Sequence, residues 1–325
     1  MNLTVTSSPH IRNKVNTRSI MLDVVIALIP ALIAGVWHFG MRALLVSVVC
    51  VAAALASEWI CGALIYKRNT TMDGSAIVTG LLLALTLPAT VPYEIAAIGS
   101  AFAIIVIKGL CGGLGKNIFN PALAGRAFLM LLWPVYLVRY AAPGAELSLF
   151  GSNVDAVASA TPLHHMQMPA LPEESLLTMF LGNIGGTIGE TCTLALLLGG
   201  AYLIYRKVIS ARIPVAYLGT VAVLSLVFFK TEDPIGWMLH SVLGGGVVLG
   251  ALFMATDYAT SPVTPKGQIL YGIGCGVLTV IFRYYGLFPE GVTYAILIMN
   301  AVVWILDFYT APRRFGFKKG GKHEN

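Results

Sequence analysis

Ten runs of apolar residues, each long enough to cross a lipid bilayer, constrain this chain more than any other feature. A membrane-spanning helix needs about 17–25 such residues. The runs fall near 20–37, 42–60, 74–91, 93–110, 120–138, 184–205, 213–229, 237–256, 268–285 and 291–309. The chain is 57% hydrophobic and only 11% charged, unlike a soluble domain. The sequence therefore predicts an all-α polytopic membrane protein of about ten transmembrane helices.

The distribution of basic residues predicts how these helices are oriented. The first nineteen residues are polar and carry no pattern of a cleavable signal peptide, so we place the amino terminus in the cytoplasm. With this orientation sixteen of the 21 Lys and Arg lie inside and four outside, while Arg126 lies within a span. Because basic residues resist translocation, we expect both termini to be cytoplasmic. The net charge of +6 then reflects topology, and we expect no nucleic-acid partner.

The spans divide into two halves around one long polar loop. The predicted division is a cytoplasmic segment 1–19, a first five-helix repeat 20–139, an extracytoplasmic loop 140–183, a second five-helix repeat 184–310 and a basic cytoplasmic tail 311–325. An odd number of spans per half predicts that the repeats are inverted. In each half the third span, near 74–91 and 237–256, is rich in Gly and interrupted. Interrupted spans at matching places in inverted repeats indicate a binding site near the midplane of the membrane.

Ionisable residues in or near the spans are candidates for interior interactions. A charge at membrane depth is costly and normally faces a partner or a wet cavity, so we expect Arg126 to be functional or to form an interior ion pair. Asp73 and Asp307 are expected to be solvated or capping carboxylates, and Asp257 to cap a broken helix or to bind a cation. Glu58 and Glu190 are the remaining carboxylates of this kind. The five cysteines are scattered singly and are interpreted as packing residues, with no metal site or disulfide among them.

The segment Lys116–Leu123 follows a Gly-rich stretch and opens the fifth span. Asn120 before Pro121 predicts a helix amino-terminal cap with Pro at the first helical position. One interpretation is simply a capped helix start. The other is that the amides of Asn117 and Asn120, beside a helix amino terminus, hydrogen-bond a carbonyl-rich or anionic ring such as a flavin.

The small, polar run Asp155–Leu163 lies in the long loop. Thr161 before Pro162 is also the ordinary start of a helix, in which the hydroxyl caps the first turn. A threonine hydroxyl has no redox chemistry and is a poor nucleophile without an adjacent base. It can be esterified, however, and a phosphoester there would attach a cofactor outside the membrane.

Several ordered motifs together resemble a known family of membrane proteins. They are Ser7–His10, Asp73–Leu87, Gly112–Ala122, Asp155–Leu163 and Thr256–Gly267. In this order they resemble the NqrB/RnfD family, whose members belong to the Rnf ion-translocating oxidoreductase complex and to the related sodium-pumping NADH:quinone oxidoreductase. The resemblance is to the RnfD branch, and it extends over essentially the whole chain.

The resemblance implies a flavin-carrying subunit of the bacterial inner membrane. Rnf complexes pass electrons between ferredoxin and NAD while moving Na⁺ or H⁺, so the expected partners are the other Rnf subunits, a flavin transferase and membrane lipid. The implied cofactor is FMN, joined through its phosphate to a threonine. The family's acceptor motif, Ser/Thr-Gly-Ala-Thr, falls on Ala158–Thr161 and matches at its last two positions, which makes Thr161 the candidate acceptor.

The NqrB branch of the family also holds riboflavin within the membrane, and Asn117 and Asn120 are the candidates for contacting such a second flavin. The chain is not expected to be catalytic alone, and no residue is assigned a catalytic or metal-binding role. The resemblance also implies an inverted-repeat fold similar to that of urea transporters. The alternative function is a solute channel or transporter of this fold without a redox cofactor, with Arg126 and Asp257 along a substrate path.

Overall fold

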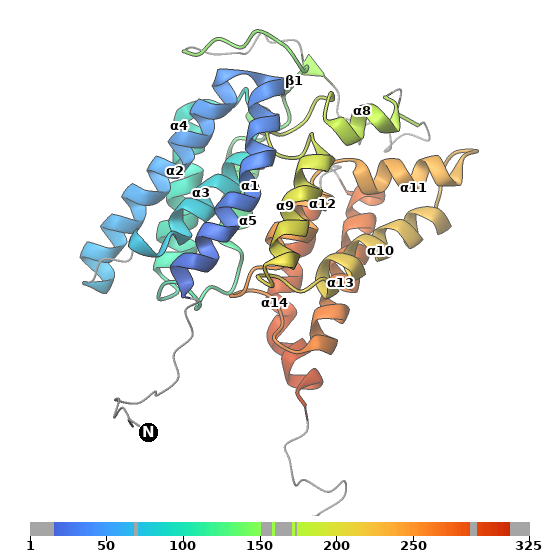
Figure 1. Ribbon diagram of the computed structural model, residues 1–325. Helices are drawn as coiled ribbons and strands as arrows, with labels where there is room; N and C mark the ends of the chain where they lie inside the picture. The colour runs from blue at the N-terminus through green and yellow to red at the C-terminus, as the bar shows by residue number, and fades with distance from the viewer. Residues whose placement is uncertain are drawn as a thin grey trace, which may run out of the picture.

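The computed structural model describes residues 16–67, 71–150, 158–159, 171–172, 174–286 and 291–312, and this part of the chain is almost entirely helical (Figure 1). The first half contains α1 (Thr17–Phe39), α2 (Met41–Cys61), the π-helical η1 (Gly62–Tyr66), the 3₁₀ turn η2 (Thr71–Asp73), α3 (Ser75–Leu85), α4 (Tyr93–Phe102), the π-helical η3 (Ala103–Gly109), α5 (Pro121–Leu132) and α6 (Pro134–Leu137). The second half contains α8 (Leu176–Leu181), α9 (Thr193–Tyr205), α10 (Arg212–Val227), α11 (Pro234–Leu243), α12 (Val247–Leu249), the π-helical η4 (Gly250–Met254), α13 (Pro265–Tyr285) and α14 (Val292–Thr310). Between the halves, strand β1 (Tyr140–Ala141) pairs antiparallel with β2 (Ala158–Ser159).

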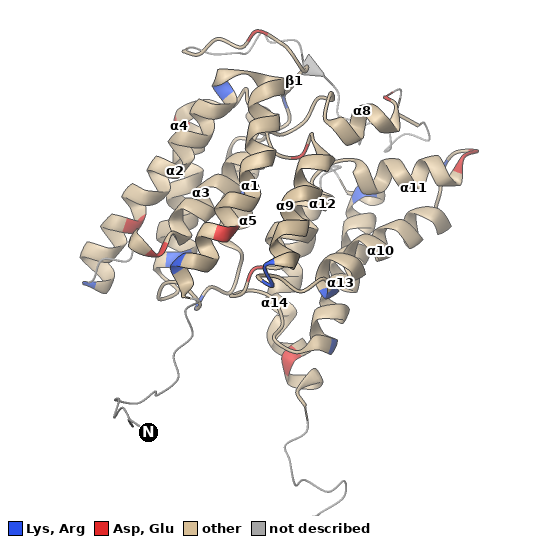
Figure 2. Ribbon diagram, viewed as in Figure 1, with Lys and Arg blue, Asp and Glu red and all other residues tan. Residues whose placement is uncertain are grey.

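Several of the helices are suited to a membrane. Within the described residues, α1, α2 with η1, α13 and α14 are long and apolar enough to cross a bilayer, and the bent pair of α11 with α12–η4 passes the same criterion as a unit. Helices α3, α5, α9 and α10 are apolar but shorter. Charged residues are sparse along the helices (Figure 2). The prediction of a polytopic helical membrane protein agrees with these observations, whereas the count of ten spans and the inverted repeat stay predictions.

Side chains with local hydrogen bonds define where helices begin. The Oδ1 atom of Asn16 accepts from the N–H of Ser19 at 2.9 Å and caps α1. The Oδ1 of Asp73 accepts from the N–H of Ser75 at 2.8 Å at the start of α3. The carboxylate of Asp307 binds the N–H of Val263 at 3.1 Å, just ahead of α13. The interpretation of Asp73 as a capping carboxylate is therefore confirmed, whereas Asp307 binds the segment ahead of α13, whose own cap is the side chain of Thr264.

Both segments that were expected to be interrupted are broken. In the first half α3 ends at Leu85, and in the second half α11 and α12–η4 meet at an angle of 59°. The span expected at 184–205 instead begins at Thr193, because the preceding segment binds the end of α3. There the N–H of Ile188 donates to the carbonyl of Leu87 at 3.0 Å, and the N–H of Gly189 to that of Leu85 at 2.8 Å.

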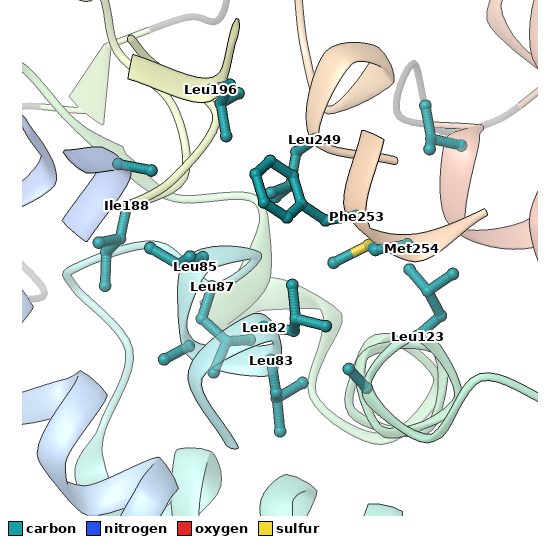
Figure 3. Close-up of a cluster of buried hydrophobic side chains, with 14 of the residues drawn as sticks. Leu82, Leu83, Leu85, Leu87, Leu123, Ile188, Leu196, Leu249, Phe253 and Met254 are labelled. Carbon is teal, nitrogen blue, oxygen red and sulfur yellow. The ribbon is translucent and has the colours of Figure 1, made fainter. Parts of the chain in front are cut away.

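The core lies where the two halves meet. Leucines of α3, Leu123 of α5, Ile188, Leu196 of α9, and Leu249, Phe253 and Met254 of the bent segment converge there (Figure 3). Small residues allow the helices to approach closely, as is common in membrane bundles. A Cβ added to Gly199 of α9 would collide with the backbone carbonyl of Ala27 in α1. The halves are therefore packed against each other at backbone contact.

Candidate functional site

A cavity opens between the two halves, at the end of the molecule where α1 begins. The empty space within it amounts to about 720 Å³ when its open mouth is included. Apolar walls come from α1, α3, α9 and η4. The polar residues that line it are Ser75, Thr79, Lys108, Asn117, Asn120, Thr256, Asp257 and Tyr258. A mostly apolar cavity with a few polar groups has the composition of a site for a small organic ligand.

The structure brings Asn117 and Asn120 together at this cavity, as the sequence predicted. Asn120 caps α5, since its Oδ1 accepts from the N–H of Ala122 at 3.0 Å, and Pro121 is the first helical residue. Its Nδ2 donates to the carbonyl of Met254 at 3.2 Å. Asn120 thus joins the start of α5 to the end of η4 in the other half.

Asn117 has no such internal role. It is 7% exposed, and its Oδ1 accepts no hydrogen bond from the part of the chain that the structure describes. A buried acceptor without a partner is costly, by roughly 1–3 kcal/mol. Because Asn117 lines the cavity, a ligand with an N–H group is a natural partner for this atom.

A buried ion pair also borders the cavity. The Nζ of Lys108, in η3, lies 2.9 Å from the Oε2 of Glu58 in α2, and both side chains are only 2% exposed. The same Nζ donates to the hydroxyl of Ser75 at 2.6 Å. The orientation predicted from the basic residues places Lys108 on the cytoplasmic side, and that prediction did not include its burial in an ion pair. The signal for this burial was present, because Lys108 and Glu58 each lie in or at the edge of an apolar span.

Asp257 and Tyr258 form the wall contributed by the segment after η4. The Oδ2 of Asp257 accepts from the hydroxyl of Thr260 at 3.0 Å. Burial raises the pKa of Asp257, although the bonds from Thr260 and from the N–H groups of Ala259 and Tyr258 act in the opposite direction. Asp257 therefore organises the turn that follows η4 and at the same time lines the cavity, and the alternative that it binds a cation stays a prediction.

Arg126 forms the interior ion pair that the sequence predicted. Its Nη1 lies 3.0 Å from the Oε1 of Glu190, and the two side chains are 6% and 4% exposed. The pair connects α5 of the first half to the segment that precedes α9 in the second. It does not border the cavity, so it belongs to the junction of the halves.

The other site predictions fall outside this region. Thr161 lies outside the described residues, so the predicted flavin attachment stays a prediction. All five cysteines are free. Among the described residues, no group of three His, Cys, Asp or Glu side chains could hold a metal ion.

The comparison with protein families decides the classification. A model of the NQR2, RnfD, RnfE family matches residues 4–316. The chain belongs to this family.

Curated relatives from the NQR2, RnfD, RnfE family extend along almost the whole chain. The D subunit of the Na(+)-translocating ferredoxin:NAD(+) oxidoreductase complex of Acetobacterium woodii is 47% identical over 98% of this chain and 97% of its own length. The D subunit of the proton-translocating ferredoxin:NAD(+) oxidoreductase complex of Clostridium ljungdahlii is 44% identical, with 97% of each chain covered. The D subunit of an ion-translocating oxidoreductase complex of Stutzerimonas stutzeri is 37% identical over 93% of both chains.

Proposed function

We propose that this chain is the flavin-carrying membrane subunit of a complex that couples electron transfer between ferredoxin and NAD to the movement of Na⁺ or H⁺. Support comes from relatives whose names describe the D subunits of such complexes and which match nearly end to end. In this proposal the other subunits of the complex are its partners. Its location is the bacterial inner membrane, with both termini in the cytoplasm. The ends of the chain in Figure 1 agree with this topology, since α1 begins and α14 finishes at the same end of the molecule.

The cavity is the observation that carries the flavin role. A flavin ring has an edge on which an N–H group lies between two carbonyl oxygens. The buried, unpartnered Oδ1 of Asn117 can accept from such an N–H, while the apolar walls contact the rest of the ring. A bound flavin supplies the electron chemistry, and the protein's own residues position the ring and set its electrostatic surroundings. We therefore assign a noncovalent flavin, riboflavin, to the cavity at Asn117 and Asn120.

A second flavin, FMN bound covalently through a phosphoester, is proposed at Thr161. Strand β2 ends two residues before Thr161, and it pairs with β1. The chain just after β1 is bound to the carboxyl-terminal end of α1, through the N–H of Gly144 and the carbonyl of His38 at 2.8 Å. The cavity is near the opposite end of α1, at Ile20 and Met21. Strand β2 and the cavity thus lie at opposite ends of α1, which is about 34 Å long. This separation is expected for a protein that carries electrons across a membrane.

Two variants separate the two flavins. The chain is expressed with a flavin transferase, purified, and examined by intact mass and by fluorescence after denaturation. Thr161→Ala is expected to lose the mass increment of one FMN and the covalent fluorescence, but to keep the flavin that denaturation releases. Asn117→Leu is expected to do the reverse. Asn183→Ala, at an exposed position away from the cavity, serves as a control that retains both.

Wild-type protein that carries neither flavin, although it is expressed with the transferase, would contradict the proposal. The solute transporter would then be the function to test, by uptake into vesicles.

A further inference from the structure

The ion pair of Lys108 and Glu58 is asymmetric with respect to the cavity. Lys108 and its hydrogen-bond partner Ser75 both line the cavity, whereas Glu58 is not among the lining residues. The residue that carries the positive charge therefore borders the ligand space, whereas its carboxylate partner does not. The other ionisable groups that face this space within the described residues are Asp257 and Tyr258.

The hydrogen bonds around Lys108 leave one donor for the cavity. An ammonium group has three N–H donors. Within the part of the chain that the structure describes, Lys108 donates to the Glu58 carboxylate at 2.9 Å and to the Ser75 hydroxyl at 2.6 Å. The third N–H has no acceptor among these residues, and the side chain is 2% exposed. A buried charged donor of this kind is costly unless a ligand uses it.

The orientation of Ser75 keeps Lys108 in this position. The single hydroxyl hydrogen of Ser75 is donated to the Oδ1 of Asp73 at 2.5 Å, so the Ser75 oxygen acts as an acceptor toward Lys108. The bonds therefore run in one direction, from Lys108 to Ser75 to Asp73. Lys108 also lies in a π-helical segment, a feature that is frequent at functional sites.

We infer that Lys108 binds the flavin in the cavity directly. Its third N–H donates to a carbonyl oxygen of the ring, on the same edge that carries the N–H bound by Asn117. The inference rests on the proposed noncovalent flavin. Reduction adds electron density to this edge of the ring, and a cation beside it binds the reduced form more tightly than the oxidised form. Lys108 thus raises the reduction potential of the bound flavin, with Glu58 as the counter-ion that holds the ammonium in the protein interior.

The test compares two neutralised ion pairs. Glu58→Gln/Lys108→Met removes both charges together, because removing one alone leaves a buried charge and can prevent folding. Arg126→Met/Glu190→Gln is the matched control, since that pair is buried to a similar degree but does not border the cavity. Riboflavin is the probe for each purified, folded protein, and the readouts are its dissociation constant and its reduction potential when bound.

The double variant at Glu58 and Lys108 is expected to lose about tenfold of the preference for reduced over oxidised riboflavin. For a two-electron couple this lowers the potential by about 30 mV. The control double variant should keep the wild-type potential, and Lys108→Arg should retain most of it because the positive charge remains. An unchanged potential and affinity in the folded Glu58→Gln/Lys108→Met protein would overturn the role of Lys108. A wild-type protein that binds no riboflavin would instead refute the proposed cavity flavin.

Discussion

The ion pair between Arg126 and Glu190 gives a quantitative test of how the two halves are joined. The two charged atoms are 3.0 Å apart, and at an effective dielectric constant of about 20 unit charges at this distance attract by about 5–6 kcal/mol. Much of this attraction offsets the cost of burying both groups. A Cβ on Gly246 would collide with the Oε1 of Glu190, so the carboxylate cannot relax in that direction. Removing either partner leaves a buried charge at a closely packed junction.

We therefore expect Arg126→Met or Glu190→Gln to destabilise the protein by roughly 3–5 kcal/mol, and the double variant to cost much less than the sum of the two. The assay is reversible unfolding in mixed micelles with increasing SDS, followed by tryptophan fluorescence. The four proteins form a double-mutant cycle, with an expected coupling energy of about 2 kcal/mol or more. Single variants that cost below about 1 kcal/mol, or costs that simply add, would show that the pair is hydrated and would refute the reasoning.

Two further changes test the packing of the helices and the capping of α5. Gly199→Ala forces a methyl group against the carbonyl of Ala27 and is expected to lower the free energy of unfolding by about 1–3 kcal/mol. The control is Gly219→Ala in α10, which has no atom within 4 Å of the added Cβ and should be neutral or slightly stabilising. Equal effects of the two variants in the micelle assay would argue against the close approach of α1 and α9. Asn120→Ala removes both the cap of α5 and the hydrogen bond to Met254, and it should lower the free energy of unfolding by about 1–2 kcal/mol. Asn120→Asp keeps the cap acceptor and should recover part of that loss. An Asp variant as unstable as the Ala variant would show that the cap contributes little.

Local chemistry explains which predictions from the sequence were confirmed. The caps by Asn120 and Asp73 each bind an N–H group only two residues further along the chain. A cap or a break therefore leaves a local signature. The sequence predicted an interior role or ion pair for Arg126 because a charge within an apolar run demands a partner. It did not identify the partner, Glu190, which is 64 residues away.

Helix lengths were predicted less well, for a tertiary reason. The prediction treated 184–205 as one apolar span, although its first nine residues include three Gly, two Thr and Glu190. In the structure α9 begins only at Thr193, because the N–H groups of Ile188 and Gly189 pair with carbonyls at the end of α3. An apolar composition does not distinguish a helical turn from an extended segment whose backbone is satisfied by another element.

Sequence alone determined the class of this protein: a helical membrane protein with broken third segments that belongs to the NQR2, RnfD, RnfE family. It also placed Asn117 and Asn120 as candidates at one site, and Thr161 as a predicted attachment point. Only the tertiary structure decided what surrounds that site. Lys108 and Glu58 are separated by fifty residues, and they meet because α2 and η3 pack side by side. Hydropathy records whether a side chain avoids water, but the partner of a buried charge is set by which helices lie next to each other.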